Sequence, residues 1–144
     1  MQQKSEDMRR NQEELDKIWE LSPVWDLLTP DQKKYIEEHS EIKKYRKNEI
    51  IHQEDDAPDY VMVIADGTIR LTKEGVGQRV QIIRLLNRRD SFGYRSAVAG
   101  DRHSSCATAI EPTVVYRVER LAFLDVIKMN NEFCFGVLEL MSND

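Results

Sequence analysis

Residues 41–118 carry the sequence feature that most constrains the fold: short β-favouring segments separated by turn signals every eight to twelve residues. We expect strands at seven places, near residues 41–46, 49–52, 60–65, 68–74, 79–86, 104–110 and 113–118. Asp66-Gly67 stands between two of these apolar runs, and this dipeptide is a strong signal for a β-hairpin. Segments of this kind at this spacing are typical of an antiparallel β-sandwich or β-barrel.

Helical patterns flank the β-segments on both sides. Before them, Thr29-Pro30 can cap and open a helix, Gln32 can reach back as in a capping box, and the helix should end near His39. After them, an apolar helix over about 121–127 is followed by a second one from about Asn131. The last helix has no terminating glycine or proline, so we expect that the chain continues in the full protein or that this helix pairs with a partner.

The chain is expected to form one domain with two appendages. Residues 1–21 read as a polar N-terminal arm with a short helix, residues 22–129 as the β-rich domain with its flanking helices, and residues 130–144 as the start of a longer helix. At 144 residues the chain is long enough to bury about two thirds of its unfolded surface.

Composition excludes several classes of protein. A net charge of −5 argues against binding nucleic acid with the whole surface, which requires a basic face. Cys106 and Cys134 are too few and too far apart for an iron–sulfur cluster or a structural zinc site. The sequence has no apolar run of the roughly 20 residues needed to span a membrane and no signal peptide at its start, so we expect a cytoplasmic protein.

Residues 90–110, DSFGYRSAVAGDRHSSCATAI, are the candidate ligand site. Small residues, backbone amides and basic groups occur together there, around a turn at Gly100-Asp101, and this suits a backbone that cradles a polar group. Arg84 precedes the stretch and shares a strand face with Ile82 and Leu86 if the strand is regular. An inward arginine needs an acid or an anionic ligand, whereas a bulge at Ile82-Ile83 would turn it to solvent; the sequence leaves both open.

With these motifs, the order of helices, short-stranded β-roll and helix pair resembles the cyclic-nucleotide-binding sensor domain. YRKNEIIHQEDDAPDYVMVIADGTIRLTKEG is similar to the start of that family's roll, with Asn48 and Asp55 where glycines are usual, and LLNRRDSFGYRSAVAGDRHSSCATAIE resembles its phosphate-binding cassette. The match covers about 22–141 and resembles most the sensor half of Crp/Fnr-type bacterial transcription regulators. It implies a mainly β fold, an antiparallel β-roll (double-stranded β-helix or jelly roll) with N-terminal helices and a C-terminal helix pair.

Two positions depart from that family's pattern. In its cyclic-nucleotide binders, a glutamate after Phe-Gly accepts the ribose hydroxyl and an arginine before Ser-Ala neutralises the cyclic phosphate. Tyr94 and His103 stand at these positions, so we do not expect an ordinary cAMP site. Arg84 and Arg95 could join His103 in a basic pocket for a small anionic effector or another nucleotide; alternatively, Arg95 pairs with Asp101 and no ligand binds. The candidate effector-binding residues are Arg84, Phe92, Gly93, Tyr94, Arg95, Ser96, His103, Ser104 and Ser105.

The resemblance implies the ligand-sensing and dimerisation module of a Crp/Fnr-type regulator, and not an enzyme. The final helix would pair with that of a second copy through Phe135, Leu138 and Met141. DNA would be bound only by a domain outside this sequence. A stand-alone nucleotide-binding-like interaction module is the alternative.

A cupin-type metalloenzyme is a further alternative from a different class. That chemistry needs two histidines one residue apart and further ligands that converge on the metal. The three histidines of this chain, His39, His52 and His103, are isolated in the sequence, and His52 reads as a packing or surface residue. We therefore expect no metal, and the sequence indicates no certain cofactor besides the small anionic effector or nucleotide considered above.

Overall fold

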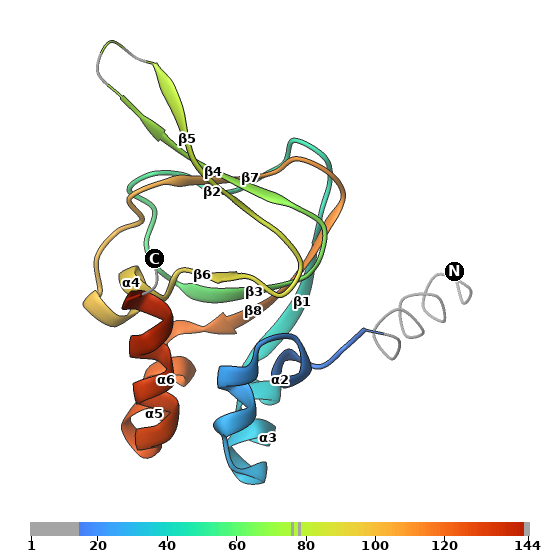
Figure 1. Ribbon diagram of the computed structural model, residues 1–144, viewed down its shortest axis with the longest axis vertical. Helices are drawn as coiled ribbons and strands as arrows, with labels where there is room; N and C mark the ends of the chain where they lie inside the picture. The colour runs from blue at the N-terminus through green and yellow to red at the C-terminus, as the bar shows by residue number, and fades with distance from the viewer. Residues whose placement is uncertain (1–14, 76, 78, 143–144) are drawn as a thin grey trace.

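The computed structural model describes residues 15–75, 77 and 79–142, so the polar arm expected at residues 1–14 lies outside the described residues. The described residues form an antiparallel β-roll with helices packed against one side (Figure 1). The helices are α2 (Ile18–Leu21), the 3-10 helix η1 (Pro23–Leu27), α3 (Pro30–Glu38), α4 (Tyr94–Ala99), α5 (Arg120–Met129) and α6 (Asn131–Ser142). The strands are β1 (Ser40–Tyr45), β2 (Ile50–His52), β3 (Tyr60–Asp66), β4 (Ile69–Glu74), β5 (Val80–Leu86), β6 (Ser91–Phe92), β7 (Cys106–Ala109) and β8 (Thr113–Glu119).

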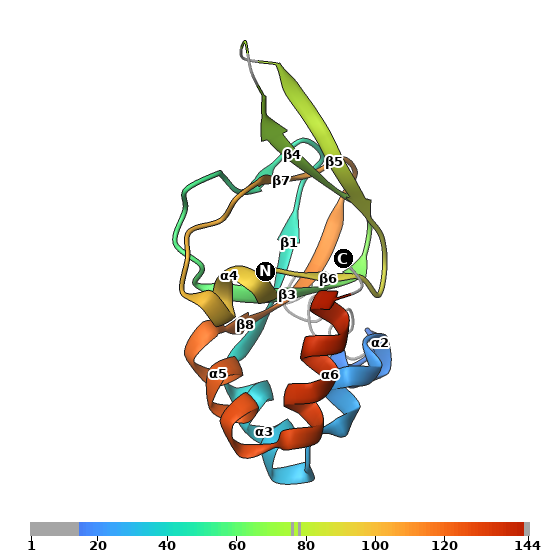
Figure 2. The same cartoon turned by 60° about the vertical axis from the view of Figure 1, so that its left-hand side comes forward.

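Within the described residues the strands form two four-stranded sheets, with strand orders β1-β8-β3-β6 and β2-β7-β4-β5. Every strand pair is antiparallel. The hairpin of β4 and β5 projects beyond the roll, on the side away from helices α3, α5 and α6 (Figure 2). The fold class expected from the sequence is confirmed. None of the helices in the described ranges has the length and apolar character needed to cross a membrane.

Strand β3 separates two layers of core. Val61 and Val63 point to the helices, where they pack with a cluster that includes Trp25, while Met62 and Ile64 point into the space between the sheets. Because both of its faces are buried, β3 reads in the sequence as a continuous apolar run instead of an alternating one. Each such buried aliphatic side chain stabilises the fold by about 1.5–3 kcal/mol.

Local sequence signals explain how several elements begin and turn. At the start of α3, Thr29 Oγ1 accepts a hydrogen bond from Gln32 N (3.2 Å) and Gln32 Oε1 accepts one from Thr29 N (3.1 Å), so the expected capping box is confirmed. Asn48 and Asp55, which stand where the family has glycines, both adopt the left-handed backbone, with φ of 70° and 69°. These two residue types tolerate that conformation better than other non-glycine residues.

The β-hairpin expected at Asp66-Gly67 does not form. Strand β3 before it pairs with β8 and β6, and strand β4 after it pairs with β5 and β7, so the turn carries the chain from one sheet to the other. Gly67 adopts a φ of +102°, and a Cβ on it would lie 2.4 Å from Thr113 Oγ1. The dipeptide marks a tight turn with a left-handed residue, but the pairing of the flanking strands is decided by which sheet buries them.

Helix α6 packs closely on η1. A Cβ on Gly136 would lie 2.6 Å from Val24 Cγ2, so only glycine allows this approach of the two elements. Asn130 fixes the start of α6, because its Oδ1 accepts a hydrogen bond from Phe133 N (3.0 Å) while its Nδ2 donates to the Leu27 carbonyl (3.1 Å). The position of α6 is therefore set by η1 at one end and, as described below, by the candidate site at the other.

Candidate ligand-binding site

The cassette, which we define as residues 90–105, folds as a short strand, a helix and a turn. Gly93 lies between β6 and α4 with a φ of +92°, and a Cβ on it would lie 3.0 Å from the Tyr60 carbonyl oxygen. Gly100 ends α4 with a φ of +73°, at the turn expected from Gly100-Asp101. Helix α4 itself was not expected from the sequence. Its signal is the glycine directly after the helix, a common C-terminal residue of helices.

A cavity of about 130 Å³ lies between the cassette, the β4–β5 hairpin and the end of α6. It is lined by Leu71, Arg84, Leu86, Ser91, Phe92, Gly93, Tyr94, Arg95 and Met141. We call it the cassette cavity. Its volume is below the range of about 300–1,000 Å³ usual for small-molecule sites. Five of the nine residues expected to bind an effector, namely Arg84, Phe92, Gly93, Tyr94 and Arg95, meet here.

Arg84 lies at the cassette cavity although β5 contains a β-bulge. Leu71 pairs with Arg84 and Thr72 pairs with Ile82, so Ile83 is the extra residue. The bulge turns Ile82 to the opposite face from Leu86, while Arg84 stays on the face of Leu71. Both alternatives from the sequence therefore hold in part: the bulge is present, and the exposed arginine still lies at the rim of the cavity.

Arg95 connects the cassette to α6. Its Nη2 donates a hydrogen bond to the Met141 carbonyl oxygen (3.2 Å), in the last turn of that helix. A cation at this end of a helix is also favoured by the helix dipole. The alternative partner considered from the sequence, Asp101, is not the group that this guanidinium contacts here. Arg95 is exposed, so an anion in the cavity could approach it from solvent.

Tyr94 is directed away from ligand chemistry and into the helical core. Its side chain is 5% exposed, and its hydroxyl accepts a hydrogen bond from Trp25 Nε1 (3.0 Å). Burial raises the pKa of Tyr94, while hydrogen bonds with Ser91 and Trp25 act in the opposite direction. Tyr94 also lines the cassette cavity, but its hydroxyl is already used in a structural contact.

Tyr94 belongs to an aromatic cluster that joins four elements. It consists of Trp25 on η1, Tyr94 on α4, Phe123 on α5 and Phe133 on α6. Ring centroids lie 5.4 Å apart for Tyr94 and Phe123 and 5.1 Å apart for Trp25 and Phe133. Tilted aromatic pairs at such distances add about 0.5–1.5 kcal/mol each beyond their burial. A displacement of α4 would therefore change the ring contacts that hold α5 and α6.

His103 lies outside the cassette cavity. Its ring stacks on that of His52, with centroids 3.7 Å apart and planes 7° apart, and the two residues are only 7% and 8% exposed. They line a hollow of about 280 Å³ together with Ile51, Asp56, Ala57, Asp59, Tyr60, Met62 and Arg117. The role of His52 as a packing residue is confirmed, whereas its pairing with His103 could not be read from two histidines isolated in the sequence.

Both rings of this pair favour the neutral form. Burial, and then the neighbouring His103, lower the pKa of His52 from 6.5 to about 4, with Asp56 acting the other way. Burial also lowers the pKa of His103, against the carboxylates of Asp56 and Asp59. His103 therefore brings no positive charge to an anionic ligand near neutral pH. The remaining candidates lie apart from the cavity lining: Ser96 in α4, exposed Ser104 and half-buried Ser105.

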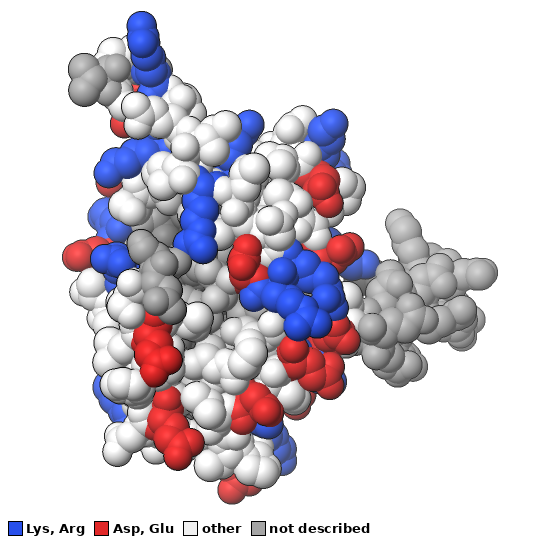
Figure 3. Space-filling model, in the orientation of Figure 1, with Lys and Arg blue, Asp and Glu red and all other residues white. Residues whose placement is uncertain are grey.

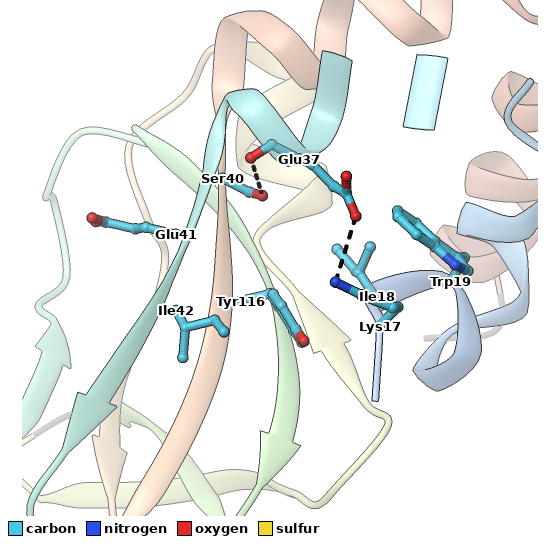
Figure 4. A pocket seen from close by; sticks show the side chains of 8 residues that line it. All are labelled: Lys17, Ile18, Trp19, Glu37, Ser40, Glu41, Ile42 and Tyr116. Atoms are coloured by element: carbon cyan, nitrogen blue, oxygen red, sulfur yellow. Dashed lines mark hydrogen bonds and ion pairs between the residues drawn. The ribbon is translucent and has the colours of Figure 1, made fainter. Parts of the chain in front are cut away.

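A larger hollow, of about 530 Å³, lies on the opposite side of the sheet that contains β3. Figure 4 shows its lining, which comes from α2, from the end of α3, from β1 and from Tyr116, with Lys17 and Glu37 facing each other across it (Nζ to Oε1, 3.8 Å). None of the nine candidate residues lines it. In the described part of the chain, the only ion pair across this hollow is exposed, and its lining offers no set of polar groups that converge on one ligand.

Charge is distributed unevenly over the surface. Figure 3 shows Lys and Arg side chains on the projecting β4–β5 hairpin, while Asp and Glu side chains dominate the helical half of this face. No continuous basic face suited to a nucleic-acid backbone is visible in this view. Among the described residues, no three His, Cys, Asp or Glu side chains are grouped so that they could hold a metal ion.

Solved structures with the same fold include bacterial transcription regulators. The catabolite activator protein of Thermus thermophilus is 21% identical with a TM-score of 0.73, and the match covers 84% of this chain and 57% of that one. The sensor domain of the transcriptional regulator DNR from Pseudomonas aeruginosa is 16% identical with a TM-score of 0.76, covering 83% and 81%. FixK2 from Bradyrhizobium japonicum is 27% identical with a TM-score of 0.66, covering 72% and 51%.

This chain spans 56–58% of the length of several proteins whose solved structures share this fold. A search of curated proteins finds no match. The family model described as the cyclic nucleotide-binding domain matches residues 42–130, which is more than half of the chain and includes both the roll and the cassette. The chain therefore belongs to the cyclic nucleotide-binding domain family.

Proposed function

We propose that this chain is the ligand-sensing and dimerisation part of a Crp/Fnr-type transcription regulator. The observation that supports the proposal is that helix α6 lines the cassette cavity on one side and exposes apolar side chains on another. Met141 of α6 lines the cassette cavity, while Phe135 and Leu138 of the same helix are 63% and 52% exposed. An effector in the cavity would shift α6 and so change how two copies pair, provided that it binds the two arrangements with different affinity.

The exposed stripe of α6 fits a helix–helix contact between two copies. Phe135 and Leu138 lie three residues apart and so face the same side of the helix. Exposed aromatic side chains such as that of Phe135 are enriched at protein interfaces, and Leu138 extends the apolar surface beside it. Residues 130–144 would then begin the dimer helix, and DNA would be recognised by a domain outside this sequence.

Sedimentation velocity at 5–100 µM, a range chosen on the order of weak-dimer affinities, tests this proposal. We expect the wild-type chain to dimerise and the variant Phe135→Asp/Leu138→Asp to remain monomeric. Leu121→Asp is the matched control, because Leu121 lies on the neighbouring helix α5 and is 70% exposed. A wild-type chain that stays monomeric throughout, or a control that disrupts the dimer equally, would contradict the assignment.

The proposed effector is a small anion held at the rim of the cassette cavity by Arg84 and Arg95. Three features argue against an ordinary cyclic nucleotide: the hydroxyl of Tyr94 is bonded to Trp25, His103 is neutral and lies elsewhere, and the cavity is small. An exposed ion pair between an arginine and an anion is worth only about 0–1 kcal/mol. Such a contact would here have to come from the two arginines.

A thermal-shift screen distinguishes these ligand classes. Sugar phosphates and other small phosphorylated compounds are expected to raise the Tm of the wild-type chain more than cAMP or cGMP does. The gain should be lost in Arg84→Gln/Arg95→Gln. A large rise in Tm with cAMP alone would overturn this ligand assignment and leave the dimerisation test unaffected.

A further inference from the structure

Two loops meet at the edge of the roll and are held together by backbone contacts. The loop between β2 and β3 (residues 53–59) faces the cassette exit, which we define as residues 101–105. Asp55 N donates to the His103 carbonyl (2.9 Å), and His103 N donates to the Asp56 carbonyl (2.9 Å). Arg102 Nη1 adds a third hydrogen bond, to the Asp55 carbonyl (2.7 Å). The conformation of the cassette exit thus depends on the neighbouring loop.

The stacked imidazoles of His52 and His103 cover the inner side of this contact. Their rings are parallel and 3.7 Å apart, and each residue is more than nine-tenths buried. Phe92, which lines the cassette cavity, lies beside the pair with its ring centroid 6.0 Å from that of His52. The pair therefore connects the cassette exit to both the β2–β3 loop and the cavity lining.

Protonation would change the balance of forces at this stack. A buried imidazolium loses hydration, and two of them at ring-stacking distance would repel each other. The charged groups that line the same hollow are Asp56 and Asp59 from the β2–β3 loop, which favour a proton on the pair, and Arg117 from β8. The Tyr60 ring, whose centroid lies 4.1 Å from Arg117 Cζ, completes the lining on that side.

We propose that the His52–His103 stack is an acid-sensitive clip, which holds the cassette exit against the β2–β3 loop and opens locally when a ring takes up a proton. Opening separates residues 101–105 from 53–59 and exposes Phe92, while both sheets stay paired. The clip is independent of the proposed regulator function, because it requires neither an effector nor a second copy. With a pKa of about 4 in the closed state and 6.5 in the open state, His52 alone shifts the opening equilibrium roughly 30-fold between pH 7.5 and pH 5.

Amide hydrogen exchange measured by NMR at pH 7.5 and pH 5.0, normalised to intrinsic rates, tests the clip. The amides of Asp55 and His103 donate across it and report its opening directly. Their protection factors should fall roughly 30-fold at the lower pH and should lie well below those of amides in the β3–β8 ladder, which exchange through global unfolding. In His52→Phe/His103→Phe, which keeps two stacked rings that cannot titrate, this pH dependence should disappear.

His39→Gln is the matched control, because His39 lies at the surface, with its Nδ1 2.9 Å from Glu119 Oε2, and is not part of the clip. This variant should keep the pH-dependent change in protection seen in the wild-type protein. Equal protection of the Asp55 and His103 amides at both pH values would overturn the proposal, as would protection of these amides as high as in the β3–β8 ladder or a pH response that survives in the double variant. If the double variant does not fold, the titration of both imidazole rings, followed by NMR in the wild-type protein, decides the question. Two rings that titrate near pH 6.5 while the Asp55 and His103 amides stay protected would exclude the clip.

Discussion

The hydrogen bond between Trp25 and Tyr94 offers a direct measurement of how strongly the cassette is tied to the helical core. Tyr94→Phe removes one oxygen and leaves Trp25 Nε1, in a residue with no exposed surface, without its acceptor. An unsatisfied buried donor costs about 1–3 kcal/mol. Because the rings keep their shapes, no large cavity adds to this figure. The loss is a substantial part of the about 5–15 kcal/mol typical of a whole domain.

Urea denaturation followed by circular dichroism measures this loss as a change in the free energy of unfolding. Tyr35→Phe is the control: its hydroxyl donates to Asp125 (2.6 Å) at the surface, where the lost bond can be replaced by water, so we expect less than about 1 kcal/mol. A double-mutant cycle with Trp25→Phe isolates the pair, with an expected coupling energy of about 0.5–3 kcal/mol.

A coupling energy near zero would refute the reasoning, because it would mean that water or another group satisfies the indole when the phenol is absent. A loss in Tyr94→Phe no larger than that in Tyr35→Phe would refute it as well. Either result would leave the Tyr94 hydroxyl available to a ligand in the cassette cavity.

Three further results are expected. Tyr94→Glu, which restores the acid usual in the family, should destabilise the domain by more than about 3 kcal/mol, because the carboxylate would be buried beside Trp25 and Phe123. It should not create cAMP binding; titration calorimetry with cAMP checks this, and a gain in cAMP affinity would contradict it. The pKa of His52 is lowered from 6.5 to about 4, so below pH 6.5 the unfolded chain binds more protons than the folded one. The free energy of unfolding should therefore fall by about 2 kcal/mol between neutral pH and pH 5. In His52→Phe, denaturation midpoints measured at the two pH values should not show this decrease. Gly136→Ala should cost about 1 kcal/mol through the contact with Val24, and Val24→Ala should reduce that cost, so additive effects would argue against close packing of α6 on η1.

Elements with strong local signals could be predicted from the sequence. Helix α3 begins at the expected capping box, and the left-handed turns at Asn48 and Asp55 follow from what these residues tolerate. The fold class followed from the spacing of strands and turns together with the cassette motif. In each case the information lies within a few neighbouring residues or in an ordered series of them.

Features that depend on contacts between distant residues could not be predicted. Asp66-Gly67 gives the shape of a turn but not the sheets of the strands on either side of it. Helix α4 has only six residues, too few for a periodic pattern. The direction of Tyr94 depends on Trp25, which is 69 residues away, and the stacking of His103 on His52 likewise joins two segments that the sequence keeps apart.

The contact between Trp25 and Tyr94 also has an evolutionary consequence. A carboxylate at position 94 would be stranded in an apolar core as long as Trp25 remains, and a change at Trp25 first would leave a buried phenol without its donor. A path between this cassette and one that carries a ligand-binding acid therefore passes through a destabilised intermediate, unless both positions change together. The residues at positions 25 and 94 are therefore energetically coupled, and either one constrains which side chains the other can become.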